Sequence, residues 1–90
     1  MIDPEHSPVG WALLMYELDD AHEHLGNLLT HMKERSDFDE TDFRIELGHV
    51  YAHLNRAWFR RTVHEDFAAS EYDAASELTT RFPTDLEPIG

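Results

Sequence analysis

The sequence predicts an all-α protein, a long antiparallel helical hairpin with a shorter third helix, which we expect to dimerise into a four-helix-like bundle. Three observations support this expectation. Two long segments carry apolar residues at steps of three and four, the spacing that places side chains on one helix face. A short acidic segment joins them. The length of 90 residues predicts one small domain, which buries only about two-thirds of its unfolded surface and would gain stability from self-association.

The first helix is predicted over residues 8–35. Residues 1–7 contain a proline and no periodicity, so we expect a flexible lead. Ser7 followed by Pro8 is typical of a helix start, with serine as the cap and proline in the first turn. The apolar stripe then covers more than six turns and comprises Trp11, Leu14, Met15, Leu18, Ala21, Leu25, Leu28, Leu29 and Met32.

The central helix is predicted over residues 42–61 and has two apolar rows. The row that we expect in the core comprises Phe43, Leu47, Val50, Tyr51, Leu54, Ala57 and Trp58, and the neighbouring row comprises Ile45, Gly48, Ala52, Asn55 and Phe59. A helix that is apolar over so much of its circumference must be covered from more than one side. Gly48 either permits close approach of another backbone or is merely tolerated.

A third helix is predicted over residues 66–81. Thr62 and Glu65 have the spacing of a capping box, which indicates that the central helix ends near Arg61, although a continuous helix is the alternative. Pro83 would end the third helix. The remaining tail, residues 83–90, is expected to be extended, with Leu86 and Ile89 docked at the open end of the hairpin.

The acidic link over residues 36–42 predicts the register of the hairpin. If the turn centres near Phe38, residues whose numbers sum to about 77 lie opposite each other. The predicted pairs are Glu17 with Arg60, Asp20 with Arg56, His24 with His53, and His31 with Glu46.

The charge of the chain excludes several function classes. Its formal charge is −12, which disfavours nucleic acid and anionic membranes as partners. The apolar run over residues 11–16 is much shorter than the ~20 residues of a membrane span, and no leader sequence is recognisable. We therefore expect a cytoplasmic protein. Without cysteine, the chain has no disulfide and no thiolate metal ligand.

Glu46 and His49 form a Glu-x-x-His element, the pattern with which ferritin-like bundles hold iron or manganese. Glu17 would lie about 10 Å out of step with this element, which disfavours a dinuclear site. The candidate set for a mononuclear site, which would suit zinc, is His24, His31, Glu46, His49 and His53. A hydrogen-bonded polar seam without metal is the competing interpretation, and we favour it.

The sequence contains no glycine-rich phosphate loop, nucleophile elbow or His-Glu-x-x-His zinc motif. It therefore favours a non-enzymatic interaction or regulatory module that acts through helix–helix contacts and an acidic surface. The alternative is a metal-binding bundle with a redox or storage role. The expected partner is a second copy of the chain, or another protein, at an interface comprising Ile45, Gly48, Ala52 and Phe59.

Overall fold

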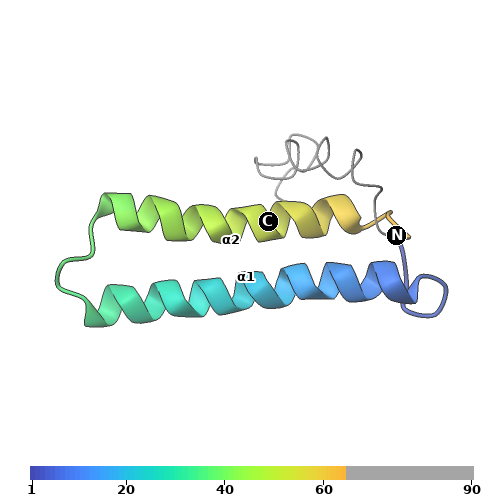
Figure 1. Cartoon of the computed structure of the whole chain (residues 1–90), viewed down its shortest axis with the longest axis horizontal. Helices are drawn as coiled ribbons and strands as arrows, with labels where there is room; N and C mark the ends of the chain where they lie inside the picture. The colour runs from blue at the N-terminus through green and yellow to red at the C-terminus, as the bar shows by residue number, and fades with distance from the viewer. Residues whose placement is uncertain (65–90) are drawn as a thin grey trace, which may run out of the picture.

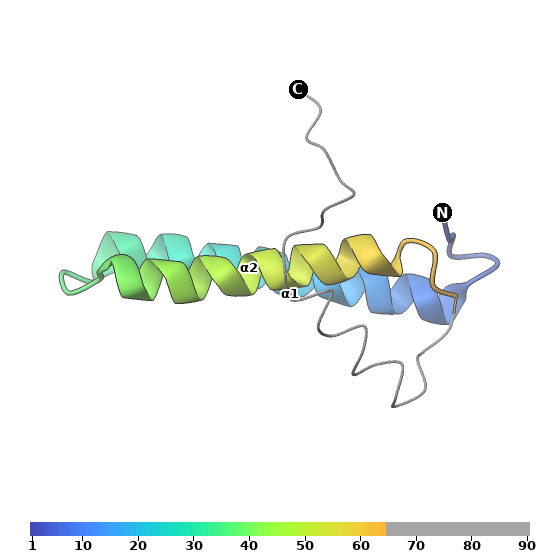
Figure 2. The same ribbon diagram turned by 90° about the horizontal axis from the view of Figure 1, so that it is seen from above.

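The computed structural model describes residues 1–64, and its two helices form an antiparallel hairpin (Figure 1). Helix α1 spans Pro8–Glu34 and helix α2 spans Glu40–Arg60. The two helices lie side by side along their length in Figure 1, and in Figure 2, which is seen from above, α2 lies in front of α1. The predicted helical hairpin is confirmed, whereas the third helix expected at residues 66–81 and the tail at 83–90 lie outside the described residues.

Helix α1 begins where the sequence predicts and ends one residue earlier. Pro8 occupies the first turn, where its missing N–H group costs nothing. Ser7 is the N-cap residue, but its side chain makes no capping hydrogen bond. The Ser7 hydroxyl contacts Nδ1 of His64 instead. At the other end, the N–H group of Arg35 donates to the His31 carbonyl and closes the last turn.

Helix α2 begins two residues earlier than predicted because Asp39 and Asp42 form a capping box. The Asp39 carboxylate accepts a hydrogen bond from the Asp42 N–H group at 3.0 Å, and the Asp42 carboxylate accepts one from the Asp39 N–H group at 3.2 Å. The helix ends at Arg60. The prediction that the central helix stops here is therefore confirmed, and the continuous helix is excluded.

The core between the helices consists of one row of buried residues from each helix. Leu14, Ala21 and Leu28 repeat every seven residues along α1, as Val50 and Ala57 do along α2, and all five are at most 7% exposed. A seven-residue repeat keeps one seam facing the partner helix, as in coiled coils. The core is narrower than the sequence predicts.

That narrow core corrects the prediction for the central helix. Tyr51 and Leu54 were expected to be buried against the first helix, yet each is 42% exposed. Phe43 is also exposed. The reason is that two helices bury only the rows that face each other, so apolar residues one row away stay on the surface.

The N-terminal segment, expected to be a flexible lead, packs against the end of α2. The N–H group of Ile2 donates to the Arg61 carbonyl at 2.8 Å, and in the first turn of α1 the N–H group of Gly10 donates to the His64 carbonyl at 3.1 Å. Ile2 and Ser7 are buried. A Cβ atom on Gly10 would lie 2.3 Å from the Val63 carbonyl oxygen, so this contact requires glycine.

Candidate functional site

Polar side chains occupy a second repeat on each helix, four residues before the core row. Glu17 and His24 precede Ala21 and Leu28 on α1, and Glu46 and His53 precede Val50 and Ala57 on α2. Because the helices are antiparallel, these positions meet on the same side of the hairpin. The resulting cluster, which we call the polar seam, comprises Glu17, His24, His31, Glu46, His49, His53 and Arg56.

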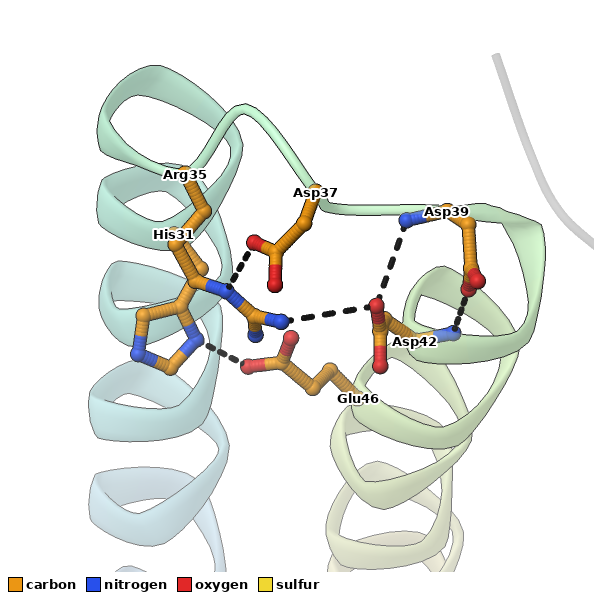
Figure 3. Close-up of polar contacts among 6 residues, drawn as sticks. All are labelled: His31, Arg35, Asp37, Asp39, Asp42 and Glu46. Atoms are coloured by element: carbon orange, nitrogen blue, oxygen red, sulfur yellow. Dashed lines mark hydrogen bonds and ion pairs between the residues drawn. The ribbon is translucent and has the colours of Figure 1, made fainter.

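At the closed end of the hairpin the seam contains the predicted pair of His31 and Glu46. The two side chains lie 2.5 Å apart, from Nδ1 to Oε1, with the carboxylate 22% exposed (Figure 3). Nearby, Arg35 donates from Nε to Asp37 at 3.1 Å. This hydrogen bond from the guanidinium lowers the pKa of the Asp37 carboxyl below its ordinary value.

The middle of the seam is a cluster of histidine rings. His24 stacks on His53 with ring centroids 5.0 Å apart, which confirms that predicted pair. His24 also meets His49 edge to face, with centroids 5.5 Å apart. The three imidazoles thus form contacts between the two helices.

Toward the open end, Glu17 joins the two helices. Its Oε2 atom lies 2.8 Å from Nδ1 of His53 and accepts a hydrogen bond from Nε of Arg56 at 3.0 Å. The predicted pair of Asp20 with Arg56 is wrong in this respect, since Glu17 is the carboxylate that Arg56 contacts. Asp20 is half exposed and reaches only to 4.0 Å from His53. Its row lies farther from the facing helix, whereas Glu17 shares the row of His24.

The five predicted metal ligands fall into two separate groups. His31 and Glu46 pair with each other, and His24 lies seven residues from His31, about 10 Å along the helix, in the ring cluster with the remaining two histidines. Within residues 1–64, no three histidine or carboxylate side chains are arranged to hold a metal ion. The geometry of these residues is that of a hydrogen-bonded polar seam.

The opposite side of the hairpin is apolar. Positions four residues after the core row, such as Leu18, Leu25 and Leu54, lie on the side away from the polar seam for the same geometric reason. The large apolar side chains on this side that are at least 39% exposed form what we call the apolar face: Met15, Leu18, Leu25, Leu29, Met32, Tyr51 and Leu54.

The predicted interface lies elsewhere, on the outer side of α2. Ile45 is 52% exposed, and Gly48 has no atom within 4 Å of the position of an added Cβ. Ala52 and Phe59 are half-buried.

Sequence reasoning assigned the leucines of the apolar face to the core. The signal that could have separated them is the seven-residue row of Trp11, Leu18, Leu25 and Met32, which runs beside the buried row.

Neither helix of the described hairpin is long and apolar enough to cross a membrane. Comparisons with protein-family models, with curated proteins and with solved structures found no match for this chain.

Proposed function

We propose that the chain is a non-enzymatic helix–helix interaction module that self-associates through its apolar face into a four-helix-like bundle. The observation that carries this proposal is the continuous run of exposed leucine, methionine and tyrosine side chains on one side of the hairpin. Monomeric proteins rarely expose apolar patches larger than a few hundred Å², and larger patches mark interaction sites.

The size of the apolar face fits a second copy of the hairpin. Its seven members are between 39% and 51% exposed, so each offers on the order of 70 Å², and the face offers about 500 Å² before neighbouring atoms are included. A typical stable interface buries about 800 Å² on each partner. Two hairpins that pack face to face, and that also bury the adjoining atoms of Leu47 and Trp58, would each bury an area in that range.

The distribution of charge also favours self-association through this face. Two chains of charge −12 repel each other, so a shared surface must be free of carboxylates. All seven members of the apolar face are uncharged, whereas Glu17, Asp20 and Glu46 lie on the side of the polar seam. A face-to-face dimer therefore keeps these three carboxylates of each copy away from the other.

Gly26 lies on α1 at the outer edge of the apolar face, whereas Gly48 lies on the outer side of α2. Neither has an atom within 4 Å of an added Cβ, so nothing within the hairpin accounts for them. Glycine inside a helix costs about 1 kcal/mol relative to alanine. Close approach of a second hairpin, toward the shorter end of the ~8–10 Å range of interhelical distances, would account for Gly26.

The remaining parts of the proposal concern the rest of the chain and its location. A third helix over residues 66–81 would add an apolar stripe of Ala68, Tyr72, Ala75, Leu78 and Phe82 near the open end. The acidic surface is suited to a cytoplasmic protein that stays soluble when its apolar face is covered. The polar seam holds the two helices of each hairpin in register.

The proposal is tested by placing charge on the apolar face. We expect sedimentation equilibrium to give twice the chain mass of 10.5 kDa for the unaltered protein, and the chain mass for the Leu25→Glu/Leu54→Glu variant. Ile45→Glu is the matched control because Ile45, at 52%, is even more exposed than Leu25 and Leu54 but lies off the face. It should remain dimeric.

Circular dichroism completes this test by showing whether the doubly charged variant still folds. Retained helical signal with loss of association would support an interaction face. An unaltered protein that sediments as a monomer at high micromolar concentration would refute the proposal. Unfolding of the charged variant would then show that the face is covered within one chain.

A further inference from the structure

His22 lies in the middle of the apolar face, where the other positions carry apolar side chains. It falls seven residues after Met15 and seven before Leu29, and Leu18 and Leu25 are its neighbours one turn away on each side. Its side chain is exposed. A second hairpin that covers the apolar face would therefore cover this imidazole as well.

His22 differs in its surroundings from the histidines of the polar seam. His31 and His53 each contact a carboxylate, Glu46 and Glu17 respectively. Within residues 1–64, the side chain of His22 makes no hydrogen bond or ion pair. When covered by apolar side chains it would have no counter-ion, and burial without a partner disfavours the charged form of any titratable group.

We propose that His22 makes self-association sensitive to pH, so that the dimer forms with neutral imidazoles and weakens as the pH falls through the range in which histidine takes up a proton, around 6.5. This inference rests on the proposed function, because it names a regulation of the same face. The role proposed for His22 is separate from that of the histidines in the ring cluster of the polar seam.

The charged groups around His22 fix the sign of the effect. On α1, Asp19 lies one turn before His22 at the border of the face and carries a negative charge. From α2, the face presents Tyr51 and Leu54, which are uncharged in this range. The second copy brings the same groups, including its own His22, whose protonation adds a like charge to the interface. Burial and this repulsion oppose the single border carboxylate.

The overall charge of the chain acts in the opposite direction and must be separated from the local effect. Acidification reduces the repulsion between two chains of charge −12 and thereby favours the dimer. At about 0.5 M salt the screening length falls to roughly 4 Å, which suppresses this long-range term. The measurements are therefore made at that salt concentration.

The test compares dimer dissociation constants from sedimentation equilibrium at pH 7.5 and pH 5.5. If both imidazoles must be neutral in the dimer, the dissociation constant of the unaltered protein should rise up to about 100-fold between pH 7.5 and pH 5.5. Each imidazole contributes about tenfold to this rise. His22→Gln should abolish most of this rise, because the amide keeps a polar side chain without a charge. His6→Gln is the control, since His6 is exposed and lies outside both helices.

The outcomes separate the inference from the function on which it rests. A dimer whose dissociation constant rises with acid equally in the unaltered protein and in His22→Gln would overturn the role of His22 and leave the proposed function intact. A dissociation constant that does not rise at pH 5.5 would do the same. Absence of any dimer at pH 7.5 would overturn both.

Discussion

Replacing Gly10 by alanine tests the contact between the two ends of the hairpin. The Cβ atom of alanine would lie 2.3 Å from the Val63 carbonyl oxygen and 2.8 Å from that of His64, and both are backbone atoms that cannot rotate away. The segment after α2 must therefore move. We expect this variant to lose the hydrogen bond from the Gly10 N–H group to His64.

The expected decrease in the free energy of unfolding follows from these contacts. Overpacking against backbone costs about 1–3 kcal/mol, and a lost hydrogen bond adds about 1 kcal/mol. The higher helix propensity of alanine offsets less than about 1 kcal/mol of this destabilisation, because the position lies in the first turn. The net effect is a decrease in the free energy of unfolding of about 2 kcal/mol for Gly10→Ala.

Gly26→Ala is the matched control in the same helix. Nothing lies within 4 Å of its added Cβ, so the variant should gain about 1 kcal/mol from helix preference alone. Urea unfolding followed by circular dichroism measures both variants, at low micromolar concentration so that self-association contributes little. With a slope of about 1 kcal/mol per molar urea, the two midpoints should differ by about 3 M. Equal stabilisation by both substitutions would refute the contact.

Three further predictions concern the polar contacts. A double-mutant cycle between Glu17 and Arg56 should give a coupling of about 1–2 kcal/mol, since both side chains are largely buried, and zero coupling would contradict the observed pairing. Asp39→Ala should lower the free energy of unfolding by about 1 kcal/mol through loss of the cap, as measured by urea unfolding. The Arg35 hydrogen bond lowers the pKa of Asp37, so NMR titration should place its midpoint below 3.8, and Arg35→Gln should move it back up. Because the folded-state pKa is depressed, any stability from this pair is present above pH ~4 and is lost as the pH falls through the lowered value.

Much of the hairpin could be predicted from the sequence because its signals are local. The apolar spacing and the Ser7–Pro8 start place α1, and the acidic link leads to the facing pairs His31 with Glu46 and His24 with His53. The predicted pairing of Asp20 with Arg56 failed because the length of the side chains decides which residues meet. A register based on residue numbers aligns backbone positions, whereas Glu17 extends about one turn to meet Arg56.

The burial pattern could not be predicted from periodicity alone. Leucines lie on one side of the core row and histidines with glutamates on the other, and apolar patterning favours burying the leucines. In the structure the facing polar side chains satisfy one another, so His53 and Glu17 are more buried than Leu25 and Leu54. The Glu-x-x-His spacing likewise could not show that Glu46 would pair with His31.

The central claim, self-association through the apolar face, is tested most directly by isotope-filtered NOE spectroscopy on a mixture of labelled and unlabelled chains. The experiment detects only contacts between copies. If the chain self-associates through the apolar face, we expect intermolecular NOEs among the side chains of Leu18, Leu25, Tyr51 and Leu54. Intermolecular NOEs confined to Ile45, or none at concentrations where the protein sediments as a dimer, would contradict it.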